Sequence, residues 1–174
     1  MERITLKKVV TRFAPSPTGT LHIGGVRTAL FNYVYAKKYD GLFLVRIEDT
    51  DRERSTKEFE KNILDSLSSI GLSPDLDPIN QSERNNIYTA AAQKLIDSNQ
   101  AYYCDCSVEE LDQMRAEQQS NGQKPQYDGR SRDKNLPKSE NTVLRLKTPL
   151  DGQVVVKDYV RGDIVFNNSE LDDL

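Results

Sequence analysis

The residues best suited to chemistry lie in a short glycine-containing segment, Thr18–Gly25, between an expected strand and an expected helix. A helix N-terminus offers unpaired backbone N–H groups and the positive end of the helix dipole, so polyphosphate can dock there. His22 is the only histidine in the sequence and could donate a hydrogen bond to phosphate oxygens as charge develops. Taken alone, however, His22–Gly25 fits a glycine-rich turn with an exposed histidine better than a functional site.

A second group of charged residues, Arg46–Asp51, lies at the carboxyl end of the apolar segment Leu42–Ile47. The apolar segment predicts a parallel strand covered on both faces, and open α/β sheets bind ligands at the carboxyl ends of their strands. At that edge Glu48 could hold a cationic group such as an α-amine, and Arg12 could bind a carboxylate. Together the two residues suit an amino acid, although the acidic run alone is better explained as a solvated loop or a capping cluster.

The elements that must position these residues alternate between strand and helix. We expect strands at Lys8–Phe13 and Leu42–Ile47 and a helix from Gly24 that Gly41 closes. A capping box at Ser55–Glu58 predicts a second helix, and a third is expected after Gln81–Ser82, with Tyr88, Ala92, Leu95 and Ile96 facing inward. This alternation predicts a doubly wound parallel α/β sheet over Lys8–Tyr103, with His22 and Glu48 lining one cleft.

The pattern changes after Cys106. A capping box at Ser107–Glu110 predicts another helix, and the polar stretch Gln118–Lys138 predicts irregular structure. Short strands are then expected at Thr142–Lys147, Gln153–Lys157 and Asp163–Phe166, with a turn at Pro149–Gly152. The acidic run Glu170–Leu174 offers no obvious closing element.

Composition limits the function classes. The chain of 174 residues is 36% hydrophobic and 29% charged, and it has no apolar run near the roughly 20 residues that a membrane span requires. A cytoplasmic location without a membrane partner is the default expectation, because the first residues do not resemble a signal peptide. The net charge of -3 would be unusual for a protein held to nucleic acid only by a general positive field.

Three segments taken together resemble the catalytic core of bacterial-type glutamyl-tRNA synthetases, which are class I aminoacyl-tRNA synthetases. These segments are Thr11–Gly19, His22–Asn32 and Arg46–Asp51. Four shorter motifs fall in the same order as in that family, so the resemblance covers nearly the whole chain: Gln81–Arg84, Ala101–Cys104, Tyr127–Arg130 and Val160–Gly162.

The resemblance implies roles for individual residues. His22–Gly25 is similar to the class I signature usually written HIGH, with Gly25 in place of the second histidine. It implies His22 and Gly24 as catalytic residues, with His22 stabilising phosphate charge and Gly24 making room for adenine. The implied ATP-binding set is Thr18, Gly19, His22, Gly24 and Gly25, and the implied glutamate-binding set is Arg12, Ala14, Ser16 and Glu48.

The resemblance also implies a reaction and a domain plan. ATP with Mg²⁺ would activate L-glutamate to glutamyl-adenylate, and the glutamyl group would pass to the 3′ end of tRNA(Glu). Residues 1–103 would form the first half of a split Rossmann domain. Residues 104–174 would form a truncated α+β insertion that binds the acceptor stem. We therefore expect a monomer that lacks the second half of the site and does not charge tRNA alone.

Zinc is not expected. Some relatives bind zinc through Cys-x-Cys with a later cysteine and histidine, and this chain has Cys104 and Cys106 for the first pair. Ser131 and Asp133 stand where the other two ligands would be. Serine is a poor zinc ligand, so two ordinary thiols are the favoured interpretation and no metal site is predicted.

Two alternatives remain open from the sequence. The related glutamyl-queuosine tRNA synthetases share the Pro15–Gly19 loop type and the Ile-Glu-Asp run, but Arg27–Asn32 and Val108–Gln126 fit the glutamyl enzymes better. Glutaminyl enzymes and archaeal or eukaryotic glutamyl enzymes fit worse than either. A hypothesis from another class is a non-catalytic module that binds tRNA or another protein.

Overall fold

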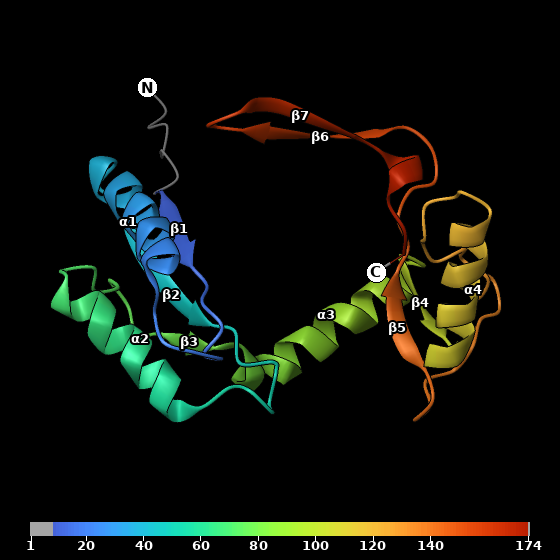
Figure 1. Ribbon diagram of the computed structural model, residues 1–174, viewed down its shortest axis with the longest axis horizontal. Helices are drawn as coiled ribbons and strands as arrows, with labels where there is room; N and C mark the ends of the chain where they lie inside the picture. Colours follow the sequence, from blue (N-terminus) through green and yellow to red (C-terminus); the bar gives the residue numbers. More distant parts are fainter. Residues whose placement is uncertain (1–8, 174) are drawn as a thin grey trace, which may run out of the picture. The chain divides into compact units, whose positions relative to one another are not determined.

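The computed structural model describes residues 9–173, which form two compact units (Figure 1). Unit 1 ends at Ile87 and unit 2 begins at Tyr88. Lys8, the expected start of the first strand, lies outside the described residues. The assignment of residues 104–174 to an acceptor-stem insertion remains a prediction.

Unit 1 contains the parallel sheet that the alternating pattern predicts. Its strands are β1 (Val10–Phe13), β2 (Leu42–Ile47) and β3 (Ile79–Asn80), paired in the order β1-β2-β3. Helix α1 (Ile23–Lys38) connects β1 to β2, and α2 (Lys57–Ser69) connects β2 to β3. Figure 1 shows α1 alongside β1 and β2. The parallel α/β architecture is therefore confirmed.

One face of this sheet forms the core of unit 1. Phe43, Val45 and Ile47 are buried alternately along β2, and they join Ile63 and Leu67 of α2 in one hydrophobic cluster. The alternate residues of β2 are only half-buried. The prediction that β2 is covered on both faces is thus wrong for the described residues, because α1 and α2 both contribute to the same cluster.

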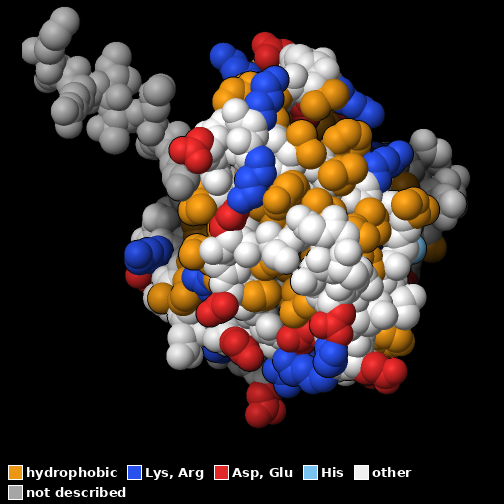
Figure 2. Space-filling model, turned by 90° about the vertical axis from the view of Figure 1, so that its left-hand side faces the viewer, with side chains coloured by type: hydrophobic (Ala, Val, Ile, Leu, Met, Phe, Trp, Pro, Cys, Tyr) orange, Lys and Arg blue, Asp and Glu red, His pale blue; other side chains and the backbone are white. Residues whose placement is uncertain are grey.

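Helix α1 keeps apolar residues on its solvent side as well. Ile23, Leu30, Phe31 and Val34 are all exposed. Figure 2, which views the molecule from the side of α1 and α2, shows hydrophobic side chains grouped among charged ones. The helix ends with Tyr39 as its C-cap, and Asp40 takes the left-handed conformation that follows. The Gly41 N–H then donates to the Ala36 carbonyl at 2.8 Å, and a Cβ atom at Gly41 would collide with the carbonyl oxygen of Val9.

The end of the parallel sheet differs from the sequence prediction. After β3 the chain forms the 3-10 helix η1 (Gln81–Arg84) and then α3 (Asn85–Asp97). No residue of α3 is fully buried, and Tyr88, expected to face inward, is 38% exposed. Strand β4 (Ala101–Cys104) pairs antiparallel with β5 (Val143–Leu146). The parallel half-domain therefore does not extend to Tyr103 as expected.

Helix α2 begins one residue later than its predicted capping box requires. Thr56 is the N-cap, and its hydroxyl accepts a hydrogen bond from the Phe59 N–H at 3.1 Å. The buried Ser55 hydroxyl has no hydrogen-bond partner. The expected Ser55–Glu58 capping box is thus wrong, since the side chain that reaches the free N–H is that of Thr56.

Removing this cap should have a measurable cost. Thr56→Ala is expected to lower the free energy of unfolding by about 1 kcal/mol, because the Phe59 N–H loses its acceptor. Ser55→Ala is the matched control and should change stability little, because its hydroxyl has no partner. Urea unfolding followed by far-UV circular dichroism measures both, and the reverse order of effects would restore Ser55 as the cap.

Unit 2 contains two antiparallel strand pairs and one capped helix. Besides β4 and β5, it holds α4 (Val108–Ser120), the hairpin of β6 (Gln153–Asp158) and β7 (Gly162–Asn167), and the 3-10 helix η2 (Asn168–Glu170). The Ser107 capping box on α4 is confirmed, with both reciprocal hydrogen bonds present. The turn expected between β5 and β6 does not join them as a hairpin, because each strand pairs elsewhere.

A buried carboxylate secures the end of unit 2. Asp173 is 4% exposed and accepts hydrogen bonds from the Tyr102 hydroxyl at 2.6 Å and from Arg132 at 3.1 Å. The backbone N–H and hydroxyl of Thr148 also donate to it, at 2.9 and 3.0 Å. Burial and this carboxylate raise the pKa of Tyr102 above its ordinary range. The acidic run thus supplies the closing element that the sequence did not reveal.

Within the described part of the chain, no helix is both long enough and apolar enough to cross a membrane.

Candidate functional site

The carboxyl ends of the three parallel strands gather the candidate residues of unit 1. The loop Ala14–Gly19 follows β1, Glu48 and Asp49 follow β2, and Gln81–Ser82 follow β3. Because the strands are parallel, these ends lie at one edge of the sheet, where α/β folds bind ligands. The candidate side chains at this edge therefore belong mainly to the short segments that follow the strands and not to the strands themselves.

His22 begins helix α1. Its backbone is extended, and its Nδ1 atom accepts a hydrogen bond from the Gly24 N–H at 3.1 Å. A neutral imidazole that accepts at Nδ1 carries its proton on Nε2, so Nε2 is the donor available to a ligand. The capping contact therefore also fixes which ring nitrogen can donate to an anion.

A cavity of about 280 Å³ lies beside this histidine. It is lined by Phe13, Pro15, Ser16, Gly19, Thr20, Leu21, His22, Gly25 and Ile63. A Cβ atom on Gly25 would lie 2.9 Å from the Leu21 side chain, and one on Gly24 would lie 2.9 Å from the His22 ring. Glycine at these two positions therefore allows the His22 ring and the Leu21 side chain to pack closely against the start of α1.

The predicted site residues are only partly brought together. Ser16, Gly19, His22 and Gly25 line the cavity, whereas Arg12, Ala14, Thr18, Gly24 and Glu48 are not among its lining residues. The Glu48 N–H donates to the Pro15 carbonyl at 2.9 Å, so its backbone is tied to the cavity wall. The Glu48 carboxylate forms an ion pair with Arg46. The prediction that His22 and Glu48 line one cleft is not met by this cavity.

Sequence reasoning missed a polar cluster beside the site. Asp49, Asn80 and Ser82 are joined by hydrogen bonds at the ends of β2 and β3. Asp49 and Ser82 line a second cavity of about 260 Å³, whose wall also includes Pro17, Arg52 and Lys57. The available signal was the position of Asp49 and Ser82 directly after two neighbouring parallel strands.

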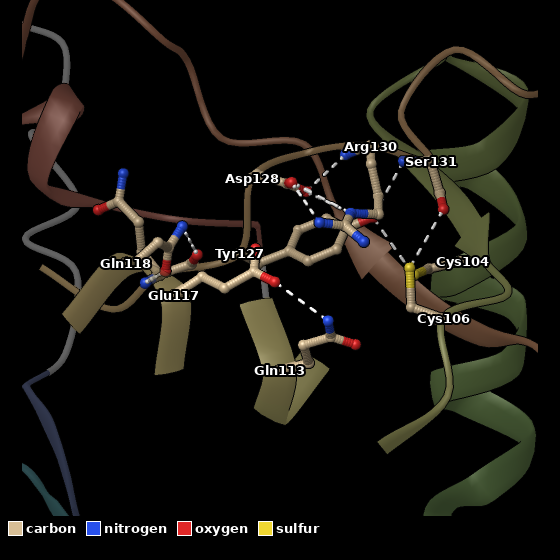
Figure 3. Close-up of polar contacts among 10 residues, drawn as sticks. Cys104, Cys106, Gln113, Glu117, Gln118, Tyr127, Asp128, Arg130 and Ser131 are labelled. Carbon is tan, nitrogen blue, oxygen red and sulfur yellow. Dashed lines mark hydrogen bonds and ion pairs between the residues drawn. The ribbon is translucent and has the colours of Figure 1, made fainter. Parts of the chain in front are cut away.

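In unit 2 the two cysteines belong to a network of hydrogen bonds (Figure 3). The Cys104 thiol contacts the Tyr127 hydroxyl at 3.3 Å, and the Cys106 thiol contacts the Ser131 hydroxyl at 3.7 Å. The Ser131 N–H donates to the Tyr127 hydroxyl at 3.0 Å, and the Arg145 guanidinium lies 3.9 Å from the centre of the Tyr127 ring. Burial alone would raise the pKa of Cys104, but hydrogen bonds from Tyr127, the Cys106 backbone and Arg145 lower it to about 7.

This arrangement does not fit a structural zinc ion. The Ser131 hydroxyl donates to Asp105 at 2.9 Å, and the exposed Asp133 adds no ligand to the two thiols. Among residues 9–173, no group of three or more histidine, cysteine or acidic side chains could hold a metal ion. Two thiols without further ligands fall short of the four that structural zinc takes, so the absence of zinc stays a prediction.

The parallel sheet, the glycine turn into α1 and the charged strand ends define a Rossmann-like α/β domain. Residues 8–174 match the family described as tRNA synthetases class I (E and Q), catalytic domain. The chain is 54% identical over 171 residues to glutamate–tRNA ligase 1 of Alkalilimnicola ehrlichii, covering 97% of the chain and 36% of that relative. It is 52% identical over 169 residues to glutamate–tRNA ligase 1 of Syntrophus aciditrophicus, with 97% and 36% covered.

Solved structures agree. The crystal structure of a glutamate–tRNA synthetase from Elizabethkingia anophelis has a TM-score of 0.84 at 39% identity, covering 97% of this chain and 38% of that one. A glutamate–tRNA ligase from Elizabethkingia meningosepticum, solved in complex with its amino acid, has a TM-score of 0.83 at 40% identity, with 96% and 38% covered. The chain belongs to the class I tRNA synthetase family for glutamate and glutamine. It spans about 36% of the length of the curated relatives it matches.

Proposed function

We propose that this chain supplies part of the active site of a glutamate–tRNA ligase. The observation that supports this proposal is the position of His22 in a chain of this family. His22 is the N-cap of α1, its Nε2 proton is available to a ligand, and it lines the same cavity as Ser16. The relatives named above are glutamate–tRNA ligases, which favours this activity over the queuosine-related one and over a non-catalytic module.

In the proposed reaction the glutamate carboxylate attacks the α-phosphorus of ATP, and pyrophosphate leaves. A ribose hydroxyl of the tRNA 3′ end then attacks the adenylate carbonyl, and AMP leaves. No covalent enzyme intermediate is formed, so the residues act by positioning and electrostatics. ATP, with Mg²⁺ as its counter-ion, would bind at Thr18, Gly19, His22, Gly24 and Gly25 beside the N-terminus of α1.

Glutamate would bind through Arg12, Ala14, Ser16 and Glu48. Arg12 is exposed at the end of β1 and suits a carboxylate, whereas Glu48 suits the α-amine. Release of Glu48 from its ion pair with Arg46 would accompany that contact. The tRNA acceptor stem would contact residues 104–174, and a monomer in the cytoplasm is the setting we propose.

The test is a chimera in which residues 1–174 replace the aligned third of the A. ehrlichii ligase. We expect the chimera to charge tRNA(Glu) with glutamate in the presence of ATP and Mg²⁺. The 174-residue chain alone should not charge tRNA, since loss of even one preorganised donor typically costs about 100- to 1000-fold in rate.

The native relative serves as the positive control, and circular dichroism of the chimera reports whether it is folded. A folded chimera without charging activity would refute the proposed function. Charging by the 174-residue chain within about tenfold of the chimera would show that these residues suffice.

A further inference from the structure

Asp49 is the most heavily hydrogen-bonded side chain at the edge of the parallel sheet. One carboxylate oxygen accepts from the Ser82 N–H at 2.9 Å. The other accepts from the Ser82 hydroxyl at 2.6 Å and from the Asn80 amide at 3.3 Å. Because all three donors belong to β3 and η1, the side chain ties the end of β2 to the end of β3.

Asn80 extends this link to α2. It is 8% exposed, and its amide nitrogen donates to Glu60 at 2.9 Å as well as to Asp49. An amide held between two carboxylates must present its nitrogen to both, so its orientation is fixed. Glu60 in turn pairs with Lys57 at 2.9 Å in the first turn of α2.

Two backbone hydrogen bonds connect these residues to the Pro15–Gly19 loop, which carries the candidate site. The Thr56 N–H, at the start of α2, donates to the Pro17 carbonyl at 3.1 Å. The Glu48 N–H, next to Asp49, donates to the Pro15 carbonyl at 2.9 Å. A closed ring of contacts thus runs from the loop through α2, Asn80 and Asp49 back to the loop, and several of its members line the cavity of about 260 Å³.

The ring depends on a carboxylate at position 49. Burial by itself would raise the pKa of Asp49, but the hydrogen bonds from Ser82 and Asn80 lower it, so the group remains an acceptor on both oxygens. Asparagine at position 49 would have one acceptor oxygen and one donor nitrogen, so its nitrogen would face either the Ser82 donors or the Asn80 amide nitrogen. Asn80 could accept a hydrogen bond from that nitrogen only by turning over its amide, which would point its oxygen at the Glu60 carboxylate.

We propose that Asp49, held by Asn80 and Ser82, is a positioning residue that sets the glutamate site by fixing Glu48 against the Pro15–Gly19 loop. The proposal rests on the proposed function. Three donors from Asn80 and Ser82 already engage both carboxylate oxygens of Asp49 at 2.6 to 3.3 Å, so its effect on the glutamate site passes through Glu48 and the loop. Its removal should therefore weaken glutamate binding more than ATP binding, because the His22 cap of α1 lies outside the ring.

Asp49→Asn in the chimera should raise the KM for glutamate about tenfold or more, since charge-assisted hydrogen bonds are the strong ones. The KM for ATP should change less than about twofold. Ser82→Ala removes one donor and keeps the backbone bond, so it should raise the glutamate KM less, by about threefold. Asp65→Asn is the matched control, because Asp65 is exposed on α2 and pairs with Lys61, away from the ring.

The outcomes separate this inference from the proposed function. If the wild-type chimera is folded but inactive, the proposed function is refuted. If the wild-type chimera is active, the positioning role is refuted when Asp49→Asn leaves the glutamate KM unchanged or raises the KM values for glutamate and ATP equally. If Asp49→Asn does not fold, Ser82→Ala decides the same question. In the 174-residue chain, hydrogen exchange should show faster exchange of the Glu48 and Ser82 amides in Asp49→Asn than in Asp65→Asn, and equal rates would also contradict the ring.

Discussion

Asp173→Ala is expected to lower the stability of unit 2 by about 3–5 kcal/mol, the usual cost of removing one partner from a buried ion pair. The lost carboxylate is 2% exposed at its side chain and is the shared acceptor for Arg132, Thr148 and Tyr102. Alanine would leave the Arg132 charge and the Tyr102 hydroxyl without this acceptor. Water cannot readily replace a carboxylate that is so deeply buried, so little of the loss should be recovered.

Asp172→Ala is the matched control for this change. Asp172 is the preceding residue, is half-buried and accepts one hydrogen bond, from the Tyr127 N–H at 2.9 Å. It should cost about 1 kcal/mol, as expected for one hydrogen bond. Urea unfolding monitored by tyrosine fluorescence gives both values, because Tyr102 and Tyr127 are buried in unit 2. Equal effects of the two substitutions would show that the buried Asp173 network contributes no more to stability than the single Asp172 hydrogen bond.

The sequence revealed those features that depend on neighbouring residues. The bounds of β2 match the apolar segment Leu42–Ile47, and the Ser107 capping box is present, because both signals lie within a few residues of the elements they define. The cap of α2 lies one residue later than predicted, since both Ser55 and Thr56 carry a hydroxyl that can cap and only the geometry of the chain selects between them.

Contacts between distant residues could not be predicted in the same way. Asp49 meets Ser82 across 33 positions, and Tyr102 meets Asp173 across 71. No local period connects such pairs, so the sequence shows Asp49 only as part of a charged run and Asp173 only as part of an acidic one. Likewise, β4 follows α3 as a parallel strand would, but its antiparallel partner β5 lies some forty positions later.

The candidate site shows the same division. The spacing of glycine and histidine predicts the loop and the helix that follows it, whereas the roles of His22 and of the glutamate set come from the resemblance to the family. What the sequence could not show is that His22 caps its own helix through Nδ1. With the phosphate-binding role proposed above, this contact gives the side chain two separable roles, one in stability and one in catalysis.

The two roles predict different stabilities but equally low activities for two substitutions at His22. In the chimera, His22→Ala should lose both, with about 1 kcal/mol less stability from the missing cap and about 100- to 1000-fold slower charging from the missing phosphate donor. His22→Asn should keep the cap, because asparagine is among the best N-cap residues. Its side chain is too short to present a donor where the imidazole Nε2 lies, so charging should fall as far as in the alanine variant.

Thermal unfolding and initial rates of tRNA charging, measured on the same three proteins, test this separation. The expected result is wild-type stability with low activity for His22→Asn, and reduced stability with equally low activity for His22→Ala. If activity instead followed stability, with His22→Asn near wild type in both, His22 would act only by starting α1. Nε2 would then have no part in binding phosphate, and the catalytic role would have to pass to another donor lining the cavity, such as Ser16 or Thr20.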